Sequence, residues 1–436
     1  MIFATAVVGW TVTHINSTTI ALAAAVVLVL SGVVSKQQLF AALGNDLTWL
    51  LVSAFIVAAV LRESGIVTDL AMIGIRSTNS LRQLFHALAL ILVMTALFFP
   101  STSGRAALLL PLFLALLKRI EDQDIARALA LLFPTIILLS ACGSLIGAAA
   151  HLIAIEFMVR AGGPHLGYFD WLVLGMPFAL ISSVIATEVI LQLFLNRDQR
   201  RLILNIPKLD QRPTGSQRRC VAIVLGATIL LWAANPFHRI DTAVIALASA
   251  LVLTLPSLSG VSLKAAMKAV EWEIVLFLAA TLVMGQALID SGAVQWLAGR
   301  LLAFVQEDWV QQPAKVVTLL AIVSASSHLV IFSRSARVVV LIPTLVLPIS
   351  GLGYNSSALI FACVVGTGLC QTLKASAKPV ALFGGLEQDT YDAKDLLKLS
   401  AILMPIIVVL VVVFSLYVWP QLGLPLRGSG AGQSSG

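Results

Sequence analysis

The chain has 436 residues, of which 59% are hydrophobic and only 11% are charged. A soluble globular domain carries about a quarter of its residues as Asp, Glu, Lys or Arg, so this composition excludes a soluble enzyme and indicates an integral membrane protein. The apolar stretches of helical length favour an all-α protein that crosses the membrane several times. The net charge of +7 fits basic cytoplasmic loops, and we expect no nucleic-acid partner because no basic patch is interleaved with aromatic residues.

The first residues of the chain, 1–75, are predicted to form scaffold helices. Apolar stretches at 1–12, 18–34 and 47–61 predict three helices, and the first of them lacks the basic start of a cleavable signal peptide. Residues 66–75 are short and amphipathic, so we expect them to lie at the membrane interface.

Residues 80–195 are predicted to form one half of a transport domain. A polar tip separates two apolar arms, and basic residues lie beyond both arms. Because basic loops mark the cytoplasmic side, we expect this hairpin to enter the membrane from the cytoplasm and return. The predicted elements are hairpin arms at 84–99 and 106–117, a helix over 125–159 that is broken near Cys142 and Gly143, and a helix over 171–195.

The next residues, 196–219, form the one long polar stretch of the chain. They hold seven basic residues against two acidic ones, among them Lys208 and Arg212. This excess of positive charge predicts a cytoplasmic linker, which is the natural boundary between two halves.

The second half repeats the first. The string LRESGIVTDLA at 61–71 resembles LIDSGAVQWLA at 288–298, and the apolar segment after Trp10 resembles the one after Trp232. We predict scaffold helices at 220–305 and the second transport-domain half at 313–419, with a hairpin at 314–349 and a broken helix at 357–383. Residues 420–436 are expected to be a flexible tail.

An odd number of spanning segments in each half inverts the second half relative to the first. With the linker in the cytoplasm, the second hairpin then enters from the outside and the C-terminus lies outside. Inverted repeats with discontinuous helices are typical of secondary transporters. The predicted fold is therefore an all-α, inverted-repeat membrane transporter with about ten transmembrane helices, two of them broken, and two re-entrant hairpins.

The two hairpin tips share the pattern S-x-S-small-R-x5-P. It reads Ser101-Thr102-Ser103-Gly104-Arg105 in the first half and Ser333-Arg334-Ser335-Ala336-Arg337 in the second. A tip in front of a helix presents unpaired backbone N–H groups and the positive end of the helix dipole. We expect Ser103 and Ser335 to cap these helices, and the two tips together to form an anion site near the middle of the membrane.

Arg105 and Arg337 lie at the same position of the two tips. An arginine at membrane depth costs about 2.5–3.5 kcal/mol on insertion scales, so two of them indicate a function. One interpretation is bidentate pairing with an oxyanion substrate. The other is that they point behind the tips and pair with carboxylates such as Glu156 or Glu188.

These features resemble the divalent anion/sodium symporter (DASS) family. Members carry Ser-Asn-Thr at each tip, where Ser101-Thr102-Ser103 and Ser333-Arg334-Ser335 stand here. They carry a Thr-Pro-Pro-Asn-like stretch in each broken helix, where Ala148-Ala149-Ala150-His151 and Ser376-Ala377-Lys378-Pro379 stand here. The resemblance implies a homodimeric elevator transporter of dicarboxylates, tricarboxylates or sulfate, usually driven by sodium.

The resemblance also implies which residues form the site. The substrate residues are expected to be Ser101, Thr102, Ser103, Arg105, His151, Ser333, Arg334, Ser335, Arg337 and Lys378. The candidates for handling a coupling ion are Cys142, Gly143, Thr367, His151 and Glu156, and a sodium ion is expected near Ser101, Ser103 and Gly143 if the protein uses sodium. We expect no other cofactor and no catalytic residue.

Departures from the family pattern bear on the coupling ion. Thr102 and Arg334 replace both tip asparagines, and Lys378 adds a further cation. Fixed positive charges would replace the mobile sodium charge, which favours sodium-independent exchange or proton coupling, with His151 as one titratable group. A sodium-coupled anion symporter, a cation/proton antiporter of the same superfamily, and a channel or receptor that binds anions without transporting them remain as alternatives. We expect a bacterial inner-membrane location.

Overall fold

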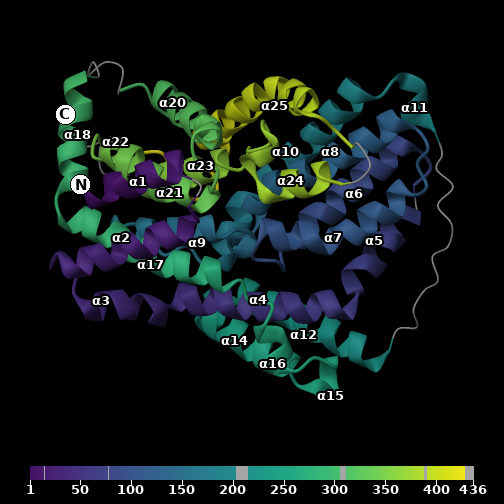
Figure 1. Cartoon of the computed structure of the whole chain (residues 1–436), viewed down its shortest axis with the longest axis horizontal. Helices are drawn as coiled ribbons and strands as arrows, with labels where there is room; N and C mark the ends of the chain where they lie inside the picture. The colour runs from purple at the N-terminus through teal and green to yellow at the C-terminus, as the bar shows by residue number, and fades with distance from the viewer. Residues whose placement is uncertain (14, 77, 203–214, 305–310, 387–389, 428–436) are drawn as a thin grey trace.

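The computed structural model describes residues 1–13, 15–76, 78–202, 215–304, 311–386 and 390–427. Within these ranges the chain is helical, and the only β pairing is an isolated bridge between Tyr354 and Arg427. The described part of the protein is therefore all-α, as the apolar stretches of helical length predict. Figure 1 shows its arrangement.

In the first half, the scaffold helices are followed by a helical hairpin, then by one helix that is broken into two parts, and then by a long helix. The helices are α1 Ile2–Val12, α2 Ser17–Leu30, α3 Lys36–Ala41, α4 Asp46–Ser64, α5 Ile66–Arg76, α6 Leu81–Thr95, α7 Thr102–Leu117, α8 Gln123–Leu139, α9 Ala149–Arg160, α10 Tyr168–Phe194 and α11 Arg197–Arg201. Helices α6 and α7 are the predicted hairpin. Between α8 and α9, short 3₁₀ turns at Ser140–Gly143 and Leu145–Gly147 form the predicted break.

The second half follows the same order. Its helices are α12 Ser216–Ala233, α13 Asn235–His238, α14 Thr242–Leu253, α15 Pro256–Ser259, α16 Leu263–Met267, α17 Trp272–Asp290, α18 Ala293–Phe304, α20 Pro313–Ser326, α21 Arg334–Leu341, α22 Leu347–Ser350, α23 Ser356–Gly366, α24 Lys378–Gly384 and α25 Ala393–Val413. Helices α20 and α21 are the hairpin, and α23 and α24 are the two parts of the broken helix.

Matched contacts support the internal repeat. The indole N–H of Trp10 donates to the carbonyl of Ser17 at 3.0 Å, and that of Trp232 donates to the carbonyl of Thr242 at 3.1 Å. The α4–α5 and α17–α18 corners turn at Gly65 and Gly292, with φ values of 69° and 71°. This left-handed conformation suits glycine, which has no Cβ, so the repeated Ser-Gly string encodes the same corner twice.

The two halves are interleaved. Helix α4 packs on α14, and α17 packs on α2, so these two scaffold contacts join one half to the other. In Figure 1, α4, α12, α14 and α16 lie together along one edge of the molecule, with the hairpins and broken helices beyond them. The rings of Phe113, Phe133 and Phe383 meet at 5.2–5.4 Å between centroids, joining α7, α8 and α24 in one core.

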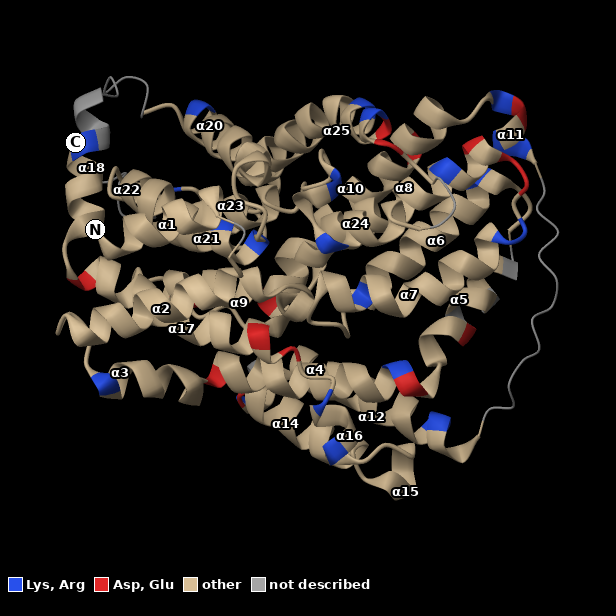
Figure 2. Cartoon of the chain, in the orientation of Figure 1, with Lys and Arg blue, Asp and Glu red and all other residues tan. Residues whose placement is uncertain are grey.

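Several helices are shorter than a membrane-spanning helix. In the part of the chain that the structure describes, five helical stretches are long and apolar enough to cross a membrane alone: 36–64, 123–143, 168–194, 272–290 and 393–418. Helix α2 has 14 residues, about 21 Å at 1.5 Å per residue, and it ends at Leu30 rather than near 34. Figure 2 shows long helical stretches without charge and charged residues gathered near helix ends and around α11.

One boundary prediction needs correction. The tail does not become flexible at residue 420, because Leu424 and Leu426 are buried and the Asn355 N–H donates to the Leu426 carbonyl at 2.8 Å. Within the predicted linker, Asn196 caps α11 and α12 begins at Ser216. Residues 203–214 of the linker, with Lys208 and Arg212, and residues 428–436 of the tail lie outside the described residues.

Candidate functional site

Each hairpin tip is capped by the first serine of its string. The Ser101 hydroxyl accepts a hydrogen bond from the Gly104 N–H at 3.2 Å, and the Ser333 hydroxyl accepts one from the Ala336 N–H at 3.3 Å. The prediction that Ser103 and Ser335 are the caps is therefore wrong. Helices α7 and α21 begin at Thr102 and Arg334, so the rest of each string forms the first turn.

A cavity of about 410 Å³ lies where the two tips and the two helix breaks meet. The tips contribute Ser101, Thr102, Ser103, Ser333, Arg334, Ser335 and Arg337, and the breaks contribute Ala148, Ala149, Ser376, Ala377 and Lys378. The structure thus brings together the serines of both tips and the basic residues of the second half. Arg105 and His151 do not line this cavity.

Arg337 is the most unusual side chain of the cavity. It is fully buried, and among the described residues none of its three guanidinium nitrogens has a hydrogen-bond partner. A buried charge without a partner is costly, because it has lost its water without gaining a protein acceptor. The cavity that it lines is therefore suited to a group that accepts hydrogen bonds and carries negative charge.

Arg334 is partly satisfied. Its Nε donates to the Thr367 hydroxyl and its Nη2 donates to the Val364 carbonyl, each at 3.3 Å, whereas its Nη1 has no partner. Thr367, predicted as a coupling-ion residue, is fully buried and holds Arg334 in place. Arg334 and Arg337 both line the cavity, and among the described residues four of their guanidinium nitrogens have no hydrogen-bond partner.

Arg105 has the opposite environment, although its string is nearly the same. It is fully buried behind the first tip and donates to the Thr95 and Ser140 hydroxyls at 3.1 and 2.8 Å. It also donates to the Leu92 and Ile137 carbonyls at 2.6 and 3.0 Å. Arg105 therefore points behind the tip, as the second interpretation has it, but its partners are hydroxyls and carbonyls rather than a carboxylate. Its predicted contact with a substrate stays a prediction.

The two carboxylates suggested as arginine partners are occupied elsewhere. Glu156 pairs with Arg160 at 2.7 Å, one helical turn away on α9. Glu188 pairs with Arg82 at 2.8 Å and His86 at 2.6 Å, joining α10 to the start of α6. Glu156, which is a predicted coupling-ion residue, therefore already forms an ion pair with Arg160.

The remaining coupling-ion candidates lie behind the cavity. His151 is fully buried, its Nδ1 is 2.9 Å from the Ser144 carbonyl, and its ring stacks on Trp171 at 5.0 Å. Its Nε2 has no hydrogen-bond partner. Cys142 and Gly143 are buried in the first helix break. These residues position the break, and their part in coupling stays a prediction.

Sequence reasoning missed the scaffold side of the site. Asn16, Thr18, Glu273 and Phe277 also line the cavity. The Asn16 amide donates to the Glu273 carboxylate at 2.8 Å, and the Thr18 hydroxyl donates to the Glu273 carbonyl at 3.1 Å. Asn16 is recognisable as the N-cap of an apolar helix, but no local pattern shows that it faces the second half.

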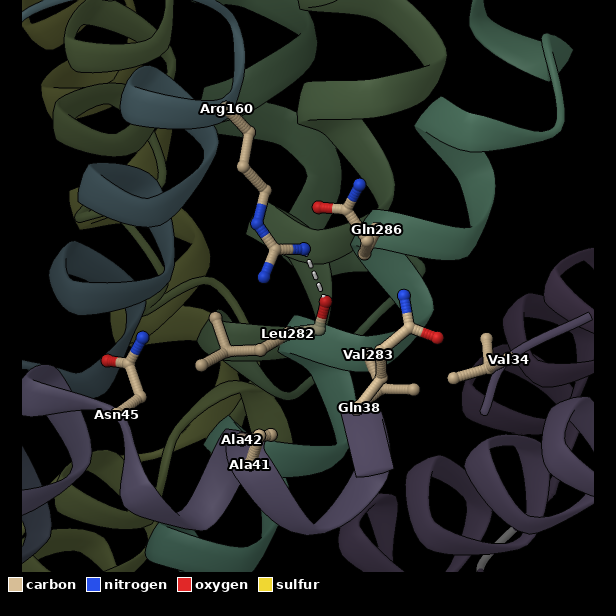
Figure 3. Close-up of a pocket in the computed structure, with 9 residues that line it drawn as sticks. All are labelled: Val34, Gln38, Ala41, Ala42, Asn45, Arg160, Leu282, Val283 and Gln286. Atoms are coloured by element: carbon tan, nitrogen blue, oxygen red, sulfur yellow. Dashed lines mark hydrogen bonds between the residues drawn. The ribbon is translucent and has the colours of Figure 1, made fainter. Parts of the chain in front are cut away.

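A second cavity, of about 310 Å³, lies between α9, α17 and the α3–α4 corner. Figure 3 shows Arg160 reaching across it to the Leu282 carbonyl, a 2.6 Å hydrogen bond, with Gln38, Asn45 and Gln286 around it. Because Arg160 is already paired with Glu156, this cavity offers a weaker anion site than the one between the tips.

Comparisons with known proteins agree on the kind of protein. The citrate transporter family model matches residues 3–368 and, in a second match, residues 229–424. A citrate/succinate antiporter of Escherichia coli is 24% identical over 372 residues, covering 80% of this chain and 74% of that protein. A membrane protein of Cupriavidus necator is 22% identical over 273 residues, covering 59% of this chain and only 52%, about half, of the relative.

Solved structures show the fold. The YdaH transporter of Alcanivorax borkumensis superposes with a TM-score of 0.61 at 17% identity, covering 90% of this chain and 89% of that one. The specific resemblance to the DASS family is not confirmed by these matches. The family and the E. coli relative are transporters and not enzymes. The chain therefore belongs to the citrate transporter family.

Proposed function

We propose that this protein carries a multivalent carboxylate of the citrate class and binds it between the two hairpin tips. The observation that supports this most is Arg337, whose three unpaired guanidinium nitrogens are buried in the wall of the cavity. A guanidinium fork matches a carboxylate in two parallel hydrogen bonds. The E. coli relative is named for citrate and succinate.

The charges around the cavity fit a substrate with more than one carboxylate. Arg334, Arg337 and Lys378 supply positive charge from the second half, and the start of α7 adds the positive end of a 16-residue helix. A substrate with carboxylates at both ends can reach the arginines with one end and the first tip with the other. A cation would meet strong repulsion here, which disfavours the cation/proton antiporter.

The coupling that we propose is exchange or proton coupling, without sodium. Arg334 and Lys378 stand where the resemblance places sodium-site residues, and a fixed guanidinium or ammonium can balance substrate charge in place of the ion. Exchange needs only that the loaded carrier crosses the membrane faster than the empty one. Arg337 without a partner among the described residues, together with the one unpaired nitrogen of Arg334, makes the empty site electrostatically unfavourable, which supports that expectation.

The transport step that we propose is an elevator movement in a homodimer. The hairpins and broken helices form the moving body, whereas α2, α4, α14 and α17 form the scaffold. Interleaved scaffold helices and exposed apolar side chains such as Phe40, Trp49 and Leu230 support a face that meets lipid or a second copy. We propose an inner-membrane protein with residues 196–219 in the cytoplasm and the C-terminus outside.

Ligand binding by the purified protein tests the proposed function. Citrate, succinate, sulfate and phosphate are titrated by calorimetry in detergent, with sodium or with choline as the only monovalent cation. We expect citrate to bind and sodium to make no difference. Absence of binding by every carboxylate would contradict the proposed substrate class, and binding that requires sodium would contradict the proposed coupling.

A further inference from the structure

The first hairpin tip already holds a carboxylate of the same chain. Glu271 stands at the N-cap position of α17, and its Oε1 lies 3.4 Å from the position that a Cβ on Gly104 would occupy. The Ser101 hydroxyl oxygen lies 3.8 Å from the same position, on the same side of the tip as the carboxylate. Since the Ser101 oxygen accepts from the Gly104 N–H, its own proton is free to be donated to the carboxylate.

This position is where a substrate carboxylate is expected at the first tip. The start of α7 offers N–H groups and the positive end of the helix dipole, and a carboxylate can use both. At the second tip, by contrast, Arg337 has no acceptor at all. One side of the site is thus matched by an internal carboxylate, while the other side has donors without partners.

Neighbouring groups shift the pKa of the Glu271 carboxyl in opposite directions. Burial raises the pKa of the Glu271 carboxyl, and nearby Glu273 acts in the same direction, whereas the Ser101 hydrogen bond and the Lys378 charge lower it. In the first half, the helix that corresponds to α17 is α4, and its N-cap is the neutral Asn45. The carboxylate is therefore a feature of one half only.

We propose that Glu271 is a tethered carboxylate that competes with a substrate carboxylate for the first hairpin tip. Substrate then binds fully only when Glu271 swings away or takes up a proton. This inference rests on the proposed function, because it assumes that the cavity between the tips is the substrate site. In this proposal Glu271, a scaffold residue, controls the affinity of the transport site for its anion.

The size of the effect follows from the fraction of time that the tip is free. If Glu271 occupies the tip about 90% of the time, the apparent Kd of the substrate is about tenfold weaker than the intrinsic value. A Glu271→Gln variant removes the charge, so we expect it to bind citrate about tenfold more tightly than the parent near neutral pH.

The pH dependence has a defined sign. The carboxyl competes as an anion, so its competition fades as pH falls and it becomes protonated. The ratio of the Glu271→Gln Kd to the parent Kd should therefore rise from about 0.1 near pH 7.5 toward 1 as the pH falls and Glu271 takes up its proton. Citrate titrates too, but it does so equally with both proteins, so the ratio isolates Glu271.

Calorimetric titration of citrate at several pH values tests the proposal. In Glu271→Asp the carboxylate is retracted by one methylene, so this variant should also bind citrate more tightly than the parent. It tests the proposal even if Glu271→Gln fails to fold. Glu121→Gln, an exposed loop carboxylate, is the control and should match the parent. Kd values for Glu271→Gln and Glu271→Asp that are equal to or weaker than the parent's overturn this inference alone. A parent protein that binds no citrate at any pH overturns the proposed function instead.

Discussion

Two arginines at equivalent positions should respond in opposite ways to the same substitution. Arg337→Met removes a buried charge that has no partner in the protein. Replacing buried charges by apolar side chains of similar volume is often neutral or stabilising by about 1–4 kcal/mol. The ligand-free Arg337→Met protein should therefore melt at the same temperature as the parent or higher.

Arg105→Met should instead destabilise the protein. It breaks hydrogen bonds to Thr95, Ser140 and two carbonyls, and leaving buried acceptors without donors costs about 1–3 kcal/mol each. Part of this loss is offset because the buried charge disappears as well, so we expect a net destabilisation of about 2–4 kcal/mol.

Citrate binding should show the reverse order. A hydrogen bond to a charged group contributes about 1.5–3 kcal/mol, so losing a bidentate contact at Arg337 should weaken the citrate Kd by at least about a hundredfold. The fraction of Arg105→Met protein that remains folded should bind citrate with a Kd within about threefold of the parent's Kd.

Thermal melting in detergent and calorimetry on the same preparations give both readouts. Arg62→Met, which changes a half-exposed arginine, controls for loss of charge. The reasoning would be refuted if Arg337→Met lowered the ligand-free melting temperature while leaving the citrate Kd unchanged, because Arg337 would then be a structural residue.

Three further predictions concern the local structure and the coupling. Gly175→Ala should destabilise the protein, because a Cβ at this position would clash with the Cys142 carbonyl in the first helix break. Thermal melting checks this prediction, with Gly226→Ala as the control because a Cβ on Gly226 would point into open space. Asp122→Ala should cost about 1 kcal/mol through loss of the α8 cap. The pKa of Asp122 is lowered by its hydrogen bond with Gln199, so its contribution is present above the ordinary aspartate pKa and is lost as pH falls through the lowered value. Denaturation curves of the parent and Asp122→Ala should differ at neutral pH and should converge at acidic pH. Replacing sodium by choline should leave citrate exchange unchanged, and exchange that stops in choline would refute the fixed-cation argument.

Much of the fold could be predicted because it is written in repeated local signals. Ser64-Gly65 and Ser291-Gly292 specify the same left-handed corner, and the apolar arms with a polar string between them specify each hairpin. The ends of the hairpin helices were less predictable, because each tip offers two serines that could cap. The structure uses the first serine of each pair.

The difference between Arg105 and Arg337 could not be predicted, because it depends on distant partners. Ser327 stands ten residues before Arg337, as Thr95 stands before Arg105, and both hydroxyls donate to a carbonyl three residues earlier at 2.6 Å. Arg105 bonds to its hydroxyl and to the neighbouring helix break, whereas Arg337 bonds to neither and lines the cavity. Similar local strings therefore produce one structural arginine and one with free donors.

The scaffold side of the site was also beyond local reasoning. Asn16 and Glu273 are 257 residues apart in sequence and meet only because α2 and α17 pack across the two halves. Glu271 meets the first tip for the same reason. A pattern that is read along the chain shows a helix cap at Asn16, and only the tertiary packing shows that Asn16 and Glu273 line the cavity.

Counterflow in proteoliposomes tests the central claim most directly. Vesicles loaded with unlabelled citrate and placed in labelled citrate without sodium should accumulate label when they contain the parent protein. Vesicles with Arg337→Met should accumulate no more than protein-free vesicles. Failure of the parent to exchange citrate, or exchange by Arg337→Met at the parent rate, would contradict a citrate-class carrier that holds its substrate at the second hairpin tip.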